Sequence, residues 1–137
     1  MELTKKQEEG LKTAVERYRN KEMYTTIAGY AGVGKSTLVR FIIEALNLDP
    51  EKEVAYISYT GKATQVLHSK GCPNVMTAHR LLYYSRQKKD GTFYHIPRNH
   101  IGNYKIVVVD EVSMLPKNMW DLLLSHKKHV IALGDPG

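Results

Sequence analysis

Cysteine is nearly absent from this sequence, and long apolar runs are absent altogether. Cys72 is the single cysteine in 137 residues, so an internal disulfide is impossible and a zinc site built from a cysteine cluster is excluded. No apolar run approaches the roughly 20 residues of a membrane span, and the polar residues 1–6 are not followed by the apolar core of a signal peptide. We therefore expect a cytoplasmic protein with no membrane partner.

Length and composition indicate one folded domain, with room for a small insertion. Hydrophobic residues make up 42% and charged residues 25% of the chain, which is ordinary for a globular protein with a buried core. The formal net charge is +6. A basic domain suits a nucleic-acid partner, but many basic proteins have none, so charge alone leaves both interpretations open.

The spacing of apolar residues indicates strands that alternate with helices. The β-branched run 106–109 is typical of a strand buried on both faces, as in parallel sheets. Thr4 is expected to cap the first helix. The alternation favours an α/β domain with a mostly parallel sheet. The expected helices are 4–18, 36–46, 62–70, 77–83 and 116–126, and the expected strands are 23–28, 53–59, 106–109 and 130–133.

One segment, 82–96, departs from the alternation. It has two aromatic-rich arms around Asp90-Gly91, a dipeptide that strongly indicates a β-hairpin. Cations outnumber acids from residue 86 to residue 105, and aromatic residues are interleaved with them. Cations and rings together suit single-stranded nucleic acid, although a solvated hairpin whose rings pack on the domain explains the composition equally well.

The strongest motif is the glycine-rich segment Gly29-x-x-x-x-Gly34-Lys35-Ser36. Glycines let the backbone wrap closely around a phosphate, and the following helix adds the positive end of its dipole. In such a loop the lysine reaches the β- and γ-phosphates and the hydroxyl binds Mg²⁺. The motif therefore predicts an ATP site.

Two acids directly follow the apolar strand 106–109, and they complement the phosphate loop. Asp110 stands where a parallel sheet places its ligand groups, so it can complete a Mg²⁺ site. Glu111 can act as the base for an attacking water, which favours hydrolysis over transfer to a small substrate. A third apolar strand, 130–133, leads to Gly134-Asp135, and Asp135 either approaches the γ-phosphate through a water or belongs to an ordinary turn.

Taken together, these segments resemble the first motor domain of superfamily 1 DNA helicases of the RecD-like, 5′-to-3′ branch. The resemblance covers nearly the whole chain, in the family's order. It is carried by Gln7, GYAGVGKST (29–37), TGKA (60–63), TAHRLL (77–82), VVVDEVSML (107–115) and LGDP (133–136).

The resemblance implies a RecA-like P-loop NTPase fold with helices on both faces of the sheet. It implies that Gln7 reads adenine, that Ser36 and Asp110 bind Mg²⁺, and that Lys35, Asp110 and Glu111 carry the hydrolysis of ATP. The implied nucleotide contacts are Gln7, Gly29, Gly32, Val33, Gly34, Lys35, Ser36, Thr37 and Asp135. The implied contacts to single-stranded DNA are Thr60, Gly61, Lys62, His79 and Arg80, with Lys88 and Lys89 of the hairpin added.

The resemblance also implies a domain organisation. Residues 1–83 and 105–137 would form the motor domain, and 84–104 would form an inserted hairpin that splits the duplex. The family's LGDP motif normally continues past the point where this chain stops, and a second motor domain supplies arginines to the γ-phosphate. We therefore expect a fragment of a longer helicase that is poorly active alone and that works with replication or repair proteins.

Three alternatives remain open. A small-molecule P-loop kinase would leave Glu111 and the segment 77–82 without a purpose. A non-catalytic nucleic-acid-binding module would use the same fold only to bind. A motor of the same superfamily could also move along RNA instead of DNA.

Overall fold

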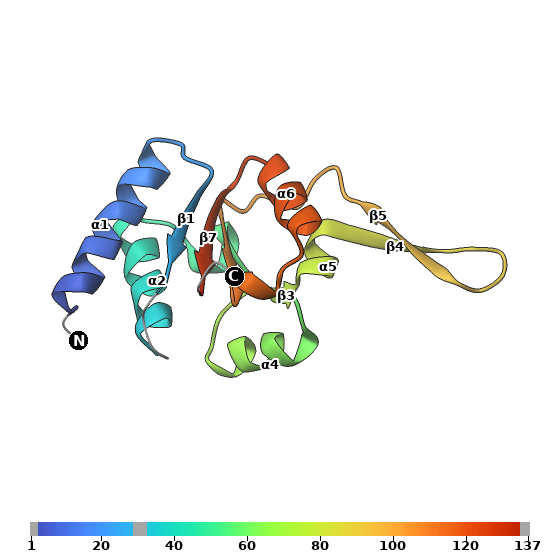
Figure 1. Cartoon of the computed structure of the whole chain (residues 1–137), viewed down its shortest axis with the longest axis horizontal. Helices are drawn as coiled ribbons and strands as arrows, with labels where there is room; N and C mark the ends of the chain where they lie inside the picture. Colours follow the sequence, from blue (N-terminus) through green and yellow to red (C-terminus); the bar gives the residue numbers. More distant parts are fainter. Residues whose placement is uncertain (1–2, 29–32, 135–137) are drawn as a thin grey trace.

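A five-stranded parallel sheet forms the centre of the molecule in the computed structural model, which describes residues 3–28 and 33–134 (Figure 1). All four pairings between neighbouring strands are parallel. The strand order is β1-β7-β6-β2-β3. The strands are β1 (Tyr24–Ile27), β2 (Val54–Ser58), β3 (Val75–Thr77), β6 (Ile106–Val109) and β7 (His129–Leu133).

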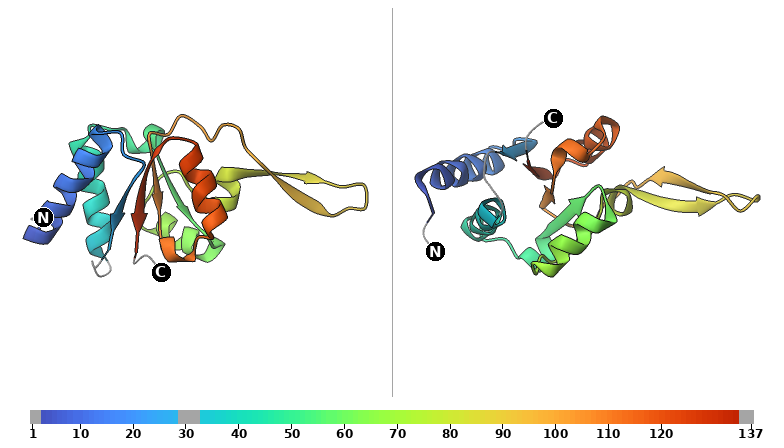
Figure 2. Two further views of the ribbon diagram at one scale, coloured as in Figure 1. Left: turned by 45° about the horizontal axis from the view of Figure 1, so that its top comes forward. Right: turned by 60° about the horizontal axis from the view of Figure 1, so that its bottom comes forward.

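Helices cover both faces of this sheet (Figure 2). One face packs against α1 (Lys5–Arg19), α2 (Val33–Ala45) and α4 (Gly61–Ser69). The other face packs against α5 (Ala78–Leu82) and α6 (Lys117–Ser125). The predicted α/β fold, with a parallel sheet between two helical layers, is therefore confirmed.

The alternation of side chains along β6 explains the two cores. Ile106 and Val108 join the core under α1 and α2, whereas Val107 and Val109 join the core under α6. All four side chains are at most 1% exposed. A strand covered on both faces needs apolar residues at every position. The prediction that 106–109 is such a strand is therefore confirmed.

Three short elements were not predicted, among them the 3₁₀ helix η1 (Val112–Met114). The strand β3 has three half-buried residues, which is too short to show a periodic pattern. The helix α3 (Pro50–Glu53) is capped by Asp49, whose Oδ1 accepts from the amide of Glu51 at 3.0 Å. Because of this extra turn, Glu53 ends a helix, and the second strand begins one residue later than predicted.

The predicted hairpin is present as β4 (Tyr83–Gln87) and β5 (Phe93–Pro97), and it projects away from the sheet (Figure 1). Its turn is closed by the amide of Lys88, which donates to the carbonyl of Thr92 at 2.7 Å. Asp90 stabilises the turn by accepting from the amide of Thr92 at 3.0 Å. Within the described residues, no helix is both long and apolar enough to cross a lipid bilayer.

Candidate nucleotide and nucleic-acid sites

Three parallel strands end side by side at one edge of the sheet. The register pairs Ile27 of β1 with Leu133 of β7, and Val109 of β6 with Ala132 of β7. The amide of Gly134 also donates to the carbonyl of Ile27 at 3.0 Å. The end of β1 and the acids that follow β6 therefore lie at the same edge.

The phosphate-loop motif follows β1 in the sequence and continues into the first turn of α2. Gly29, Gly32 and Asp135 lie outside the described residues, so their roles stay predictions. The helix α2 begins at Val33. Its first turn therefore presents the positive end of the helix dipole where the motif predicts a phosphate. In this turn Gly34, Lys35 and Ser36 are half-buried and Thr37 is buried.

Asp110 is half-buried directly after β6, and its backbone amide donates to the carbonyl of Ile57 at 2.9 Å. Burial raises the pKa of this carboxyl group above its ordinary value, and the neighbouring charge of Glu111 raises it further. The ammonium groups of Lys70 and Lys35 act in the opposite direction. Lys35 at the start of α2 therefore favours the ionised form of Asp110, whereas burial and Glu111 oppose it.

The chemistry of this site fits Mg²⁺. Ser36 and Asp110 offer the oxygen donors that this ion prefers, and a divalent cation would offset the charge repulsion between Asp110 and Glu111. In ranges 3–28 and 33–134, no group of three or more His, Cys, Asp or Glu side chains could hold a metal. A metal here would take few ligands from protein and the others from phosphate and water, which is how Mg²⁺ binds with nucleotides.

Glu111 adopts an unusual backbone conformation. Its φ of 52° lies in the left-handed region, at the position before the short 3₁₀ helix η1 (Val112–Met114), and its side chain makes no capping hydrogen bond. Gly134 has a φ of 106°, and a Cβ added there would lie 3.8 Å from Oε2 of Glu111. The exposed carboxylate of Glu111 therefore lies beside the end of β7, the strand between β1 and β6. Non-glycine residues in this region cluster at functional sites.

Gln7 connects α1 to the phosphate-loop helix. It is 9% exposed, and its side-chain Oε1 accepts from the amide of Thr4 at 2.9 Å in a capping box. Its Nε2 donates to the carbonyl of Gly34 at 3.4 Å. Both ends of the side-chain amide therefore have protein partners, and recognition of adenine by Gln7 stays a prediction. The predicted cap at Thr4 is present, with Oγ1 accepting from the amide of Gln7 at 3.1 Å.

The two segments predicted to contact single-stranded DNA begin helices at the same edge of the sheet. Thr60 caps α4, with its Oγ1 accepting from the amide of Ala63 at 3.2 Å. Thr77 caps α5 in the same way, through the amide of Arg80 at 3.2 Å. The structure leaves Thr60, Gly61, Lys62 and Arg80 exposed and His79 half-buried.

Four rings join these segments to the base of the hairpin. The ring of His79 lies 5.6 Å from Tyr59, 6.0 Å from Tyr83 and 5.8 Å from His95, measured between centroids. His95 also hydrogen-bonds Ser85 across the hairpin at 3.1 Å. The sequence singled out His79 but not His95. Cross-strand pairing of position 95 with position 85 is the signal that could have placed His95 on the same hairpin face as Tyr83.

The far part of the hairpin is exposed and basic. Lys88 and Lys89 are exposed near the turn, and the ring of Phe93 is 67% exposed. Cations lie over rings on one face, with Arg86 5.4 Å from the ring centroid of Tyr84. The guanidinium of Arg98 also holds the base of the hairpin, because its Nε donates to the carbonyl of Tyr83 at 3.0 Å.

Comparisons with known proteins agree with this geometry. The profile of the family described as the AAA domain matches residues 11–137. The chain is 27% identical to the ATP-dependent DNA helicase dda of Enterobacteria phage T4 over 126 residues, which cover 90% of this chain and 29% of that protein. It is 34% identical to the ATP-dependent DNA helicase PIF1 of Trypanosoma brucei brucei (strain 927/4 GUTat10.1) over 96 residues, which cover 69% of this chain and 9% of that protein.

The chain therefore spans less than a third of the length of these two relatives. The match to the family covers the described ends of β1, β6 and β7, together with both helix-capping segments. It confirms the resemblance to a superfamily 1 helicase motor domain, and the chain belongs to the AAA domain family.

Proposed function

We propose that this chain is a motor domain that binds ATP with Mg²⁺ and binds single-stranded DNA. In the full-length protein it couples ATP hydrolysis to 5′-to-3′ movement and to duplex unwinding. One observation carries the proposal: Lys35, at the start of α2, lies at the same edge of the parallel sheet as the adjacent acids Asp110 and Glu111, which are about 75 residues away in sequence.

The start of α2 holds the phosphates in this proposal. Backbone amides at a helix N-terminus stabilise an anion, and the ammonium of Lys35 neutralises the charge of the β- and γ-phosphates. Ser36 and Asp110 would hold Mg²⁺, which when bound stabilises charge on the phosphate oxygens. The carboxyl group of Asp110 serves in its ionised form, which the charges of Lys70 and Lys35 favour against the effects of burial and of Glu111.

Glu111 acts as the base in this proposal. A water attacks the γ-phosphorus in line with the bond to the leaving oxygen, and Glu111 accepts a proton from that water. The carboxylate suits this role because it is exposed and its side chain caps no helix amide. Its left-handed backbone directs it toward Gly134 at the end of β7.

Single-stranded DNA lies along the capped ends of α4 and α5. Lys62 and Arg80 are exposed there and can neutralise phosphates, while the rings around His79 offer surfaces for bases. The hairpin β4–β5 separates the duplex, with the exposed ring of Phe93 and the cations Lys88 and Lys89 at its far end. Other segments of the full-length protein complete the ATP site, and its replication or repair partners are part of the same proposal.

Two substitutions of the same type test the proposal in the full-length protein. Lys35→Ala should abolish the heat of ATP binding in calorimetry and leave binding of a labelled single-stranded DNA unchanged. Arg80→Ala should weaken DNA binding and leave the affinity for ATP unchanged. Unchanged ATP affinity in Lys35→Ala would refute the ATP site.

Activity assays test whether the protein moves along DNA or RNA, and in which direction it moves. Single-stranded DNA should stimulate phosphate release more than single-stranded RNA of the same length. A duplex with a 5′ single-stranded tail should be unwound, and a duplex with a 3′ tail should not. Stronger stimulation by RNA would show that the protein moves along RNA instead of DNA.

A further inference from the structure

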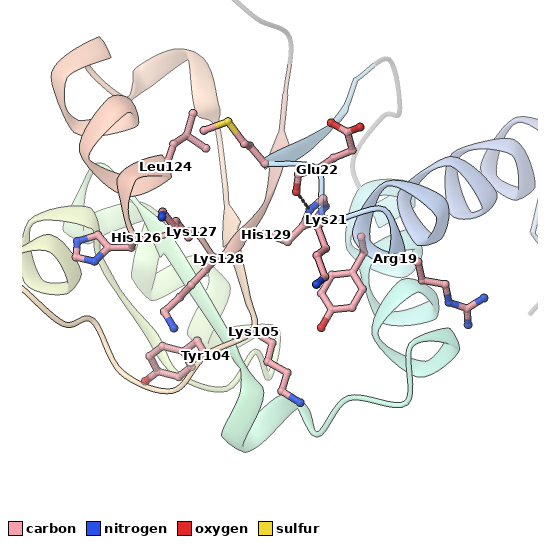
Figure 3. A pocket seen from close by; sticks show the side chains of 12 residues that line it. Arg19, Lys21, Glu22, Tyr104, Lys105, Leu124, His126, Lys127, Lys128 and His129 are labelled. Carbon is pink, nitrogen blue, oxygen red and sulfur yellow. Dashed lines mark hydrogen bonds between the residues drawn. The ribbon is translucent and has the colours of Figure 1, made fainter.

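A basic pocket opens at the amino-terminal ends of β1, β6 and β7 (Figure 3). Asp110 and Glu111 follow the carboxyl end of β6, so the pocket is on the opposite edge of the sheet. It has a volume of about 800 Å³. Three segments that are far apart in sequence form its walls: the end of α1 and the turn after it, residues 104–105 before β6, and the stretch 124–129 from the end of α6 to the start of β7. We call this site the basic pocket.

Positive charge in the basic pocket is largely uncompensated. Lys21, Lys127 and Lys128 line it, and within the described ranges none of them forms an ion pair with a carboxylate. Glu22 is the one acid among the described lining residues, and its carboxylate already faces Arg17 at 3.9 Å.

Lys128 is the least solvated of these cations. It is half-buried, and burial lowers the pKa of its ammonium group below the ordinary value. Figure 3 shows Lys128 and Lys21 lining the opening from different segments, with Tyr104 beside Lys128. An anionic partner placed between them would replace the solvation that Lys128 has lost.

Apolar groups complete the basic pocket. Met23 is 55% exposed, and Leu124 and two tyrosines also line the site. The rings already have neighbours: Tyr18 meets His129 edge-on at 5.6 Å, and a Cβ added at Gly102 would lie 3.0 Å from the ring of Tyr104. Met23 and Leu124 therefore offer apolar contacts that suit an aliphatic or aromatic side chain.

We propose that the basic pocket binds an acidic peptide segment of a partner protein. Aspartate or glutamate side chains lie against Lys21, Lys127 and Lys128, and one apolar side chain of the segment packs against Met23 and Leu124. Charge complementarity and the apolar contacts of Met23 and Leu124 together distinguish such a segment from a nucleic-acid backbone, which carries charge but no apolar anchor. Because the pocket is on the opposite edge from the ATP site, partner and nucleotide can bind at the same time.

The test uses a fluorescein-labelled peptide of aspartates that ends in leucine and phenylalanine. Fluorescence anisotropy of this peptide measures its binding to the whole chain. The double variant Lys21→Glu/Lys128→Glu should raise its Kd at least about tenfold, because two favourable charge contacts become repulsive. The matched control Lys12→Glu/Lys117→Glu makes the same change in net charge at exposed residues outside the pocket, and it should leave the Kd within about twofold.

Two further measurements separate the pocket from general charge attraction. Circular dichroism checks that the variants fold, and the single variant Lys21→Glu, at an exposed position, carries the test if the change at Lys128 unfolds the chain. Replacing leucine and phenylalanine of the peptide by serine should weaken binding to the unmodified chain and have little effect on the double variant.

Three results would overturn the proposal. The first is no binding of the peptide at millimolar concentration. The second is an equal loss in both double variants, which would show attraction to net charge alone. The third is that the double variant loses affinity for oligothymidylate but keeps its affinity for the peptide, which would make the basic pocket a nucleic-acid site.

Discussion

Replacing Glu111 by glutamine should remove ATP hydrolysis while leaving the fold and ATP binding intact. The side chain is exposed and caps no helix, and glutamine has the same shape. The left-handed backbone at this position strains glutamate and glutamine equally, so the free energy of unfolding should change by less than about 0.5 kcal/mol.

The expected effect on the rate follows from the role of a general base. Such a group contributes about 10²–10⁴-fold, so the variant should lose about 3–5 kcal/mol of transition-state stabilisation. The assay is steady-state phosphate release from the full-length protein with saturating single-stranded DNA, together with calorimetric ATP binding. Asp121→Asn, at an exposed acid on α6, is the matched control and should hydrolyse ATP at the normal rate.

The same variant makes an independent prediction for Asp110. The charge of Glu111 helps to raise the pKa of Asp110, so glutamine at position 111 should lower that pKa. Asp110 would then stay ionised to lower pH, and Mg²⁺-dependent ATP binding should persist further into acid than in the unmodified protein. Normal turnover in Glu111→Gln would refute its assignment as the base, and an unchanged pH profile of binding would refute the coupling to Asp110.

Three other predictions follow from contacts elsewhere in the chain. Full-length protein lacking residues 88–93 should hydrolyse ATP on single strands but unwind a tailed duplex poorly; normal unwinding would remove the hairpin as the separating element. Gln7→Ala breaks the capping box and the bond to the phosphate-loop helix, so denaturant unfolding should show a loss of about 1 kcal/mol; no loss would show that these bonds contribute nothing to stability. Burial lowers the pKa of His129, whose ring hydrogen-bonds Thr25 and the carbonyl of Glu22, so the unfolded chain takes up the proton more readily. Stability is then fully present above about pH 6.5 and falls as the pH drops below it, a dependence that His129→Gln should reduce in thermal melts at several pH values.

Several features of this protein are determined by the sequence alone because they depend on residues that are close together in the chain. The run 106–109 predicts a strand buried on both faces, and Thr4 predicts the start of α1. Asp90-Gly91 predicts the hairpin turn, where Asp90 and Thr92 make the local hydrogen bonds. Caps, turns and burial patterns of this kind involve neighbours within about four residues, so they can be recognised without a tertiary structure.

Only the tertiary structure decides how these pieces meet. The position of β7 between β1 and β6 depends on pairing between distant segments, and it brings Lys35 and the acids after β6 to one site. The side chain of Glu111 lies beside Gly134 because the backbone of Glu111 is left-handed, and no local sequence pattern predicts this conformation. The rings of Tyr59 and His95 around His79, and the cations of the basic pocket, likewise gather from distant parts of the chain, because packing and strand order are properties of the whole fold.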